Sequence, residues 1–242
     1  MARKSLPMWC AVLAILVQTG CAPSPLSELG VAEPEEIGLT WQECPDRAHE
    51  WEEAENCFGH PMPLWEEGEH GNFARRLADG ESLELTIGRD VYRAVPRGHL
   101  LTQQRYTLYR NGRAVKSLYG TLTAYSPNVS LQNVGGKAVW EFSDGKTVTI
   151  IYDGKDVRDL YQLEKAYRPY GLGDRLIFIG QKDGKYFVIY DGRKVGPDFD
   201  LVHIAYCCEP VLWSVQCGHG KYLFWGNREG QQYVVEISLR EE

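Results

Sequence analysis

The residues with the most reactive side chains gather in two parts of this sequence. The later group combines three cysteines with an acid and a histidine, namely Cys207, Cys208, Glu209, Cys217 and His219. Thiolate, carboxylate and imidazole groups are metal ligands, and a thiolate is also a nucleophile. These five residues are therefore a candidate binding loop, and a metal site or a reactive thiol is one interpretation of it. The other is a structural disulfide from Cys217 to Cys207 or Cys208, which we favour.

The earlier group lies in an acidic stretch and consists of Cys44, His49, Cys57 and His60. Its spacing, C-x4-H-x7-C-x2-H, differs from the familiar zinc-finger spacings. In an oxidising compartment two such cysteines more often form a disulfide, so we expect a bridge between Cys44 and Cys57, with free thiols and zinc as alternatives. Apart from Cys10 and Cys21 the chain has five cysteines, so one of them is free or paired elsewhere.

Motifs of known enzyme classes are missing from the sequence. It contains no G-x-S-x-G, no H-E-x-x-H and no phosphate-binding glycine loop. The Asp-Gly pairs lack the clustered acids of a calcium loop, and hairpin turns explain them better. We therefore assign no catalytic residue, no metal and no cofactor. The net charge of -7 gives no electrostatic reason to expect nucleic-acid binding.

A repeated phrase organises the chain after residue 73, and residues 178–195 (FIGQKDGKYFVIYDGRKV) are its clearest copy. Tyr109, Tyr152 and Tyr190 each stand just before an Asn-Gly or Asp-Gly turn. An Ala-Tyr pair and a proline follow in each copy, and the prolines at 127, 169 and 210 recur at intervals of 42 and 41 residues. A partial copy occupies residues 73–105. Self-similarity at about forty residues indicates a repeat architecture.

The physical interpretation of each copy is a set of antiparallel strands. Asp-Gly and Asn-Gly between apolar runs predict hairpins, because glycine accepts the positive φ that these turns need. Residues 183–185 suit a type I turn with a glycine bulge. Residues 147–152 and 186–190 are rich in aromatic and β-branched side chains. Both alternating sets of 186–190 are apolar, so we expect this strand to be covered on both faces.

In the copy that starts at Asp153-Gly154 the pattern places four strands, near Val157, near Lys165, at 176–180 and at 186–190. Among the aromatic residues, Trp140, Trp213, Trp225 and the repeated tyrosines are candidates for an exposed binding surface. Trp140 and Trp225 fall at near-equivalent repeat positions, so we predict that both lie in the core.

Four short strands in about forty residues predict an all-β fold of antiparallel, four-stranded, blade-like repeats in a small or incomplete β-propeller-like domain. The Tyr-Asp-Gly-Lys/Arg-x-Val phrasing resembles the repeats of uncharacterised bacterial envelope proteins. Three full copies and one partial copy are few for a closed ring. The partial copy can complete a ring with the C-terminal strand, the sheets can stack openly, or the chain can close by oligomerising.

The first residues have the features of a targeting signal. Arg3 and Lys4 precede a ten-residue apolar run at 8–17, and Gly20 and Cys21 follow it. This order resembles a bacterial lipoprotein signal, which implies removal of residues 1–20 and a lipid anchor on Cys21. Gln18 departs from the aliphatic residue that the pattern prefers. An ordinary secretory signal cut near Cys21 is the alternative, and either signal implies export to the cell envelope, the periplasm or the medium.

These features divide the chain into four parts. Residues 1–20 form the signal peptide, residues 21–37 a linker or lipid-anchored tail, residues 38–72 an acidic, aromatic-containing segment packed on the body, and residues 73–242 the β-repeat domain. Between Glu28 and His70 there are 13 acidic residues and one basic residue. Such a block is typically solvated, although it can also dock on a basic surface.

The expected function is that of a non-catalytic binding or scaffolding module for an envelope protein or polysaccharide, touching the membrane through its N-terminal lipid only. The alternative is a propeller-type hydrolase or lyase that acts on an extracellular polymer. An enzyme needs ionisable residues from several copies around one cavity, whereas a binding module needs an aromatic or apolar surface patch.

Overall fold

The structure of the chain is a computed structural model, and it describes residues 35–43, 74, 76–78, 80–100, 103–121, 127–144, 146–204 and 215–240. Antiparallel strands make up most of these residues, and they form separate sheets. This arrangement confirms the predicted all-β fold of four-stranded, blade-like repeats. No helix in the described ranges has both the length and the apolar content that a bilayer span requires.

Three of the sheets each contain four strands in chain order. The first sheet holds β2 (Leu83–Ile87), β3 (Asp90–Leu100), β4 (Gln103–Arg110) and β5 (Arg113–Thr121). The second sheet holds β6 (Asn128–Val134), β7 (Lys137–Ser143), β8 (Val148–Tyr152) and β9 (Lys155–Asp156). The third sheet holds β10 (Lys165–Leu172), β11 (Arg175–Lys182), β12 (Lys185–Tyr190) and β13 (Arg193–Phe199).

The fourth sheet combines the two ends of the described chain. It contains β1 (Ile37–Glu43), β14 (Leu201–Val202), β15 (Gln216–Gly218), β16 (Lys221–Arg228) and β17 (Gln231–Leu239). The N-terminal strand β1 pairs with the C-terminal strand β17 along its whole length, from Ile37 opposite Leu239 to Glu43 opposite Tyr233. An element from outside the repeats therefore completes the last sheet.

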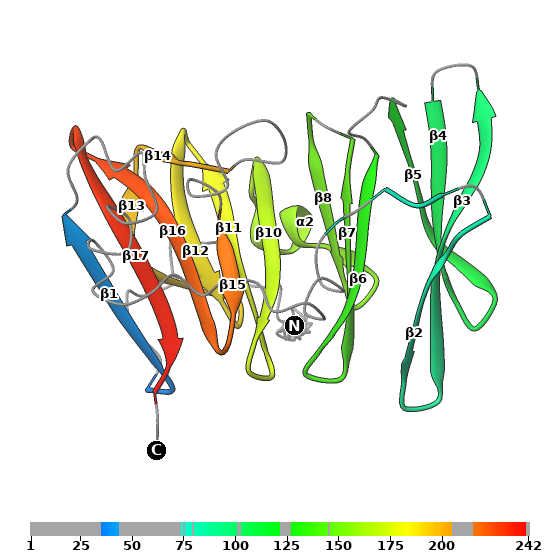
Figure 1. Ribbon diagram of the computed structural model, residues 1–242, viewed down its shortest axis with the longest axis horizontal. Coiled ribbons are helices and arrows are strands. Elements are labelled where there is room, and N and C mark those ends of the chain that lie inside the picture. Colours follow the sequence, from blue (N-terminus) through cyan, green and yellow to red (C-terminus); the bar gives the residue numbers. More distant parts are fainter. Residues whose placement is uncertain are drawn as a thin grey trace, which may run out of the picture.

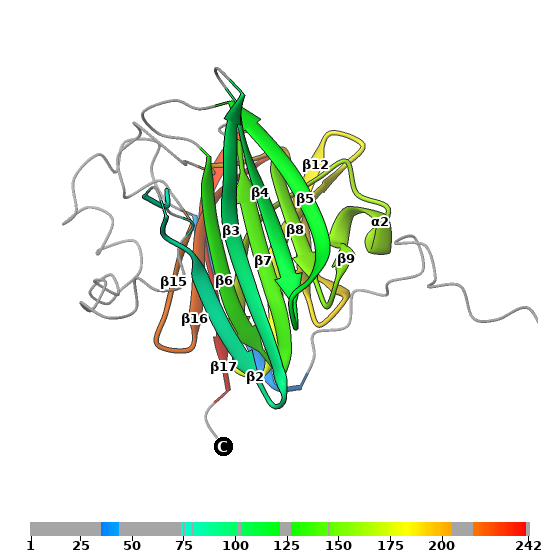
Figure 2. The same cartoon turned by 90° about the vertical axis from the view of Figure 1, so that its right-hand side faces the viewer.

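The sheets stack face to face in chain order, with the first and the fourth at opposite ends of the stack (Figure 1). The partial copy at 73–105 contributes β2 and β3 to the first sheet. Of the three arrangements left open by the sequence, a ring closed by this copy on the C-terminal strand is excluded, because β17 pairs with β1 on one edge and with β16 on the other. Figure 2 looks onto the outer face of the first sheet, with β2 and β6 on one side of the stack and β9 and α2 on the other.

A hydrophobic cluster fills each of the three spaces between neighbouring sheets. On β12, Phe187 and Ile189 pack toward the second sheet, whereas Val188 and Tyr190 pack toward the fourth. This confirms that the strand is covered on both faces. Trp140 and Trp225 are 0% and 3% exposed, so the prediction that both lie in the core is also confirmed.

The repeated tyrosine-turn motif connects the third and fourth strands of each of the first three sheets. Its turns, Asn111-Gly112, Asp153-Gly154 and Asp191-Gly192, have positive φ at both residues, as type I′ hairpins require. Asp183 and Gly184 also have φ of 51° and 72°, and Lys182 pairs with Lys185. The turn there is therefore of type I′ rather than the predicted type I with a bulge, because a two-residue primed turn matches the twist of the strands.

Each repeat as read in the sequence therefore begins one strand before the sheet that contains most of it. The copy that starts at Asp153-Gly154 gives its first strand, β9, to the second sheet and the next three strands to the third. The strand predicted near Val157 is β9, which ends at Asp156, and Val157 itself begins the short helix α2 (Val157–Tyr161). The side chain of Asp156 caps this helix by accepting a hydrogen bond of 2.9 Å from the backbone N–H of Arg158.

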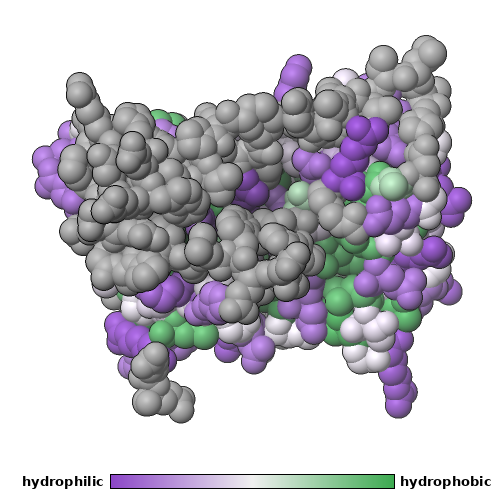
Figure 3. All heavy atoms as spheres, viewed as in Figure 1, coloured by the Kyte–Doolittle hydropathy of each residue, from purple (hydrophilic) through white to green (hydrophobic). Residues whose placement is uncertain are grey.

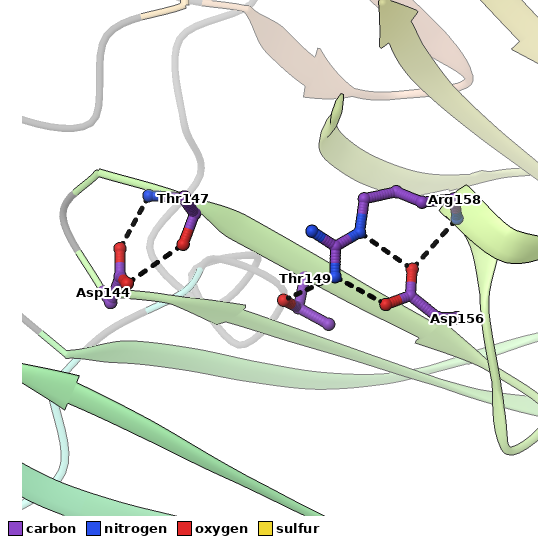
Figure 4. A network of polar contacts seen from close by, with 5 residues as sticks. All are labelled: Asp144, Thr147, Thr149, Asp156 and Arg158. Atoms are coloured by element: carbon purple, nitrogen blue, oxygen red, sulfur yellow. Dashed lines mark hydrogen bonds and ion pairs between the residues drawn. The ribbon is translucent and has the colours of Figure 1, made fainter. Parts of the chain in front are cut away.

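The same aspartate anchors a polar network on the second sheet (Figure 4). The Arg158 guanidinium donates to Asp156 at 2.6 Å and to the Thr149 hydroxyl at 3.3 Å. Burial opposes ionisation of Asp156, but the hydrogen bonds from Arg158 outweigh it and lower the pKa of the carboxyl. Asp144 closes the β7–β8 turn by accepting from the backbone N–H of Thr147 at 2.6 Å. Both aspartates stabilise turns of the fold.

Candidate binding site

The structure describes two of the predicted site residues, and both lie on the β15–β16 hairpin. Cys217 pairs with Tyr222 and packs against the core between the third and fourth sheets, as a free thiol. His219 is the first residue of the turn, has a φ of 48° and is exposed. The remaining predicted residues, Cys21, Cys44, Cys57, Cys207, Cys208 and Glu209, lie outside the described residues, as does Trp213, so the Cys44–Cys57 bridge stays a prediction. The bridge predicted from Cys217 to Cys207 or Cys208 is not formed, because Cys217 is a free thiol. Within the described ranges, no three His, Cys, Asp or Glu side chains are grouped to hold a metal ion.

The extra residues of the last copy lie before Cys217. In the third sheet the single strand β10 pairs Ala166 with Gly180 and Tyr170 with Ile177. In the fourth sheet two short strands take the place of β10 and both pair with β16. Val202 of β14 pairs with Gly226, and Gln216 of β15 pairs with Leu223. The insertion therefore falls between β14 and β15, at 203–215. Residues 216–220 are not part of it, because His219-Gly220 is the hairpin turn equivalent to Gly173-Asp174 in the third sheet.

Strand β10 of the third sheet is interrupted by a bulge at Arg168-Pro169, where its pairing with β11 shifts register. Arg168 has a φ of 51°, and such strain in a residue other than glycine costs about 1–3 kcal/mol. Side chains from both neighbouring sheets hold the bulge. The Tyr222 hydroxyl donates to the Arg168 carbonyl at 2.8 Å, and the Gln132 side-chain amide donates to the Pro169 carbonyl at 3.0 Å. The second and fourth sheets are thereby both hydrogen-bonded to the third.

Arg168 also brings together ionisable groups from three sheets. Burial raises the pKa of the Cys217 thiol, the positive charge of Arg168 opposes this shift, and the negative charge of Glu141 adds to it. Glu141 is 3% exposed, and the Ser130 hydroxyl donates to its carboxylate at 3.4 Å. A thiol whose pKa is raised stays protonated at neutral pH and is a poor nucleophile. This cluster is therefore suited to packing the sheets together rather than to covalent catalysis.

We expect the Cys217 thiol of the folded chain to react with iodoacetamide at least about tenfold more slowly at about pH 8 than the same thiol in urea-unfolded chain. The reason is that the raised pKa leaves little thiolate below the normal titration range of cysteine. Pulse alkylation of the whole chain, read at the peptide that contains Cys217, measures both rates. Equal rates would show an accessible thiolate and would favour the enzyme hypothesis.

A cleft opens between the third and fourth sheets, on the side of their last strands. It is lined by Trp41, Pro197, Phe199, Arg228, Glu229 and Tyr233 and encloses about 100 Å³. Trp41 lies opposite Val235 in the β1–β17 pair, and residues opposite each other share a face of the sheet. Val235 is buried between the third and fourth sheets, whereas Trp41 is 49% exposed at the edge of that interface. The indole ring is therefore presented to solvent.

The floor of the cleft is rigid. Phe199 is 2% exposed and packs edge-to-face on Phe224, with ring centroids 5.4 Å apart at 87°. A Cβ atom at Gly226 would lie 2.5 Å from the Phe199 ring, so a residue with a side chain cannot keep this packing. The conformation of the floor thus depends on a glycine in the neighbouring sheet.

The rim of the cleft is held by Asp200. Its carboxylate accepts a hydrogen bond of 2.7 Å from the backbone N–H of Glu229 and pairs with the Lys185 ammonium group. The hydrogen bond from Lys185, followed by that from the Glu229 backbone, lowers the pKa of Asp200. The β16–β17 turn, which carries Arg228 and Glu229, is therefore fixed to the third sheet. Arg228 Nε lies 3.6 Å from Glu229 Oε1.

Sequence reasoning did not select Trp41 as a binding residue, because it assigned the aromatic side chains of 38–72 to packing on the body. The available signal was the alternation of Ile37, Leu39 and Trp41, which is typical of a half-buried strand. Apolar side chains also show on the opposite side of the stack, in the right half of Figure 3. Leu83, Leu85 and Ile87 of β2 are partly buried against the core, unlike the half-exposed ring of Trp41.

Comparison of the chain with protein-family models, with curated proteins and with solved structures found no match.

Proposed function

We propose that this protein is an exported binding module of the cell envelope, anchored to a membrane by a lipid on Cys21, with no reaction of its own. The observation that carries the proposal is the cleft at Trp41. A half-exposed indole ring over a rigid aromatic floor, with a few fixed polar groups, is typical of a recognition site. Its partner is an envelope protein or a polysaccharide.

The ionisable residues support the same proposal over a hydrolase or lyase. An acid-base site needs a general acid and a general base that reach the substrate. Glu141 is almost fully buried, and the raised pKa of Cys217 removes the thiolate that a covalent mechanism needs. The sequence supports export and anchoring through the basic residues, the short apolar run and Cys21 at its end.

Affinity capture from the native envelope tests this function. The wild-type chain, a Cys21→Ser variant and a Trp41→Ala variant are expressed with a C-terminal tag, and both protein and glycan in the eluates are identified by mass spectrometry. We expect an acylated Cys21 at the mature N-terminus, release of Cys21→Ser from the membrane fraction, and loss of one specific partner from Trp41→Ala.

Two results would contradict the proposal. Identical partner sets for wild type and Trp41→Ala would show that the cleft does not bind. Release of fragments from isolated envelope polymer by the purified wild-type chain would show an enzyme.

A further inference from the structure

From the cleft at Trp41 we infer a binding site for one neutral sugar ring of an envelope polysaccharide, an inference that rests on the proposed binding function. The aromatic lining is the first reason. A pyranose ring has a face of C–H groups that packs on an aromatic face, and hydroxyl groups around its edge that need hydrogen-bond partners. Trp41 supplies a half-exposed indole ring, and Tyr233 and Pro197 supply further apolar walls.

The size of the cleft limits what enters it. At about 100 Å³ the cleft is smaller than the roughly 300–1,000 Å³ of typical small-molecule sites, so it takes part of one ring and not an extended chain. The remaining units of a polymer would lie outside the cleft, in the solvent next to Trp41. The site therefore fits one unit within a polysaccharide, or its terminal unit, rather than a long bound segment.

The polar lining indicates a ligand that both donates and accepts hydrogen bonds. The Arg228 guanidinium can only donate, and the ionised Glu229 carboxylate can only accept. Both side chains lie at the rim, with 45% and 81% of their side-chain surfaces exposed, so they reach a ligand without being desolvated first. Neighbouring hydroxyl groups satisfy both residues at once, since each hydroxyl is a donor and an acceptor.

The charges around the cleft indicate that the ligand is neutral. Three pairs of opposite charge lie on these elements, and Glu43, opposite Tyr233 in the β1–β17 pair, adds a negative charge on the same side. Arg228 adjoins Glu229, Lys185 pairs with Asp200, and Lys194 Nζ lies 2.6 Å from Asp198 on β13. A site for a phosphate- or carboxylate-bearing ligand would instead present an excess of positive charge. The surroundings therefore give no preference to an anionic polymer.

The site is also fixed before the ligand arrives. Asp200 holds the backbone of Glu229, and the floor residue Phe199 is locked against Phe224 and Gly226. A preformed site loses little conformational entropy on binding, which makes a weak single-ring contact measurable. Several copies anchored on one membrane would strengthen such a contact by avidity.

The test is a titration of the full mature chain, carrying Cys21→Ser to keep it in solution, with uncharged oligosaccharides of hexose and N-acetylhexosamine units. Binding is measured by tryptophan fluorescence and by saturation-transfer NMR. Trp41→Ala should weaken binding by about tenfold or more, because a central tryptophan carries much of the affinity of such a site. Trp41→Phe should restore part of it, and Arg228→Gln or Glu229→Gln should weaken it by less.

The matched control is Tyr119→Ala, which removes an aromatic side chain of similar exposure, 53%, from β5 at the other end of the stack. It should bind like the wild type, and circular dichroism establishes that each variant is folded. Two parallel arms use an oligosaccharide rich in uronic acid and a proline-rich peptide.

Tighter binding of the charged oligosaccharide, or Trp41-dependent binding of the peptide alone, would overturn the ligand class and leave the binding function standing. Saccharide binding that Trp41→Ala does not change would overturn the site. If, in addition, envelope capture did not depend on Trp41, the proposed function would fail as well.

Discussion

Replacing Gly135 by alanine should destabilise the protein by about 3 kcal/mol. Gly135 lies in the β6–β7 turn with a φ of 56°, a conformation that costs alanine about 1–2 kcal/mol. A Cβ atom there would also lie 2.2 Å from the backbone oxygen of Asp174, in the β10–β11 turn of the third sheet. A backbone atom cannot rotate away as a side chain can, so the two turns must separate.

The adjacent residue provides the control for this change. Gly136 also has a positive φ, of 76°, but nothing lies within 4 Å of the Cβ that an alanine would add. Gly136→Ala should therefore cost only the conformational strain, about 1–2 kcal/mol. Urea unfolding of both variants measures the difference. Equal losses of stability would contradict the close contact between the β6–β7 turn of the second sheet and the β10–β11 turn of the third.

Replacing Ile37 by alanine should destabilise the protein by about 2–4 kcal/mol, as large-to-small changes in a core do. Ile37 is 0% exposed and belongs to the cluster between the third and fourth sheets, although it lies outside the repeats. The loss would show that the N-terminal strand is part of the fold. Thermal unfolding followed by circular dichroism, together with urea unfolding, gives the magnitude.

Thr40, three residues later on the same strand, is the matched control. It is exposed, so Thr40→Ala should change the free energy of unfolding by roughly 0.5 kcal/mol or less. An equally small effect of Ile37→Ala would imply that β1 is not held in the last sheet. Because β1 also carries Trp41, detachment of the strand should abolish the cleft together with the stability.

The elements that were predicted correctly depend on short stretches of sequence. Asp191-Gly192 and Asn111-Gly112 predict hairpins because the positive φ of both turn residues is a local requirement. The apolar alternation on both sides of 186–190 predicts a strand buried on two faces, as Phe187 and Val188 confirm. Val157 shows the limit of this reasoning, since the cap at Asp156 ends the predicted strand after two residues and begins a helical turn.

By itself, the sequence determined the all-β class, the four-stranded repeat and the core positions of Trp140 and Trp225, because hairpin turns and side-chain alternation act between near neighbours in the chain. Only the tertiary structure decided that β1 completes the last sheet and that the third and fourth sheets enclose a cleft beside Trp41. These features join residues almost two hundred positions apart, such as Trp41 and Val235. No local preference encodes such a pairing, because it depends on the free edge that β17 offers to β1 once the other strands of the last sheet are in place.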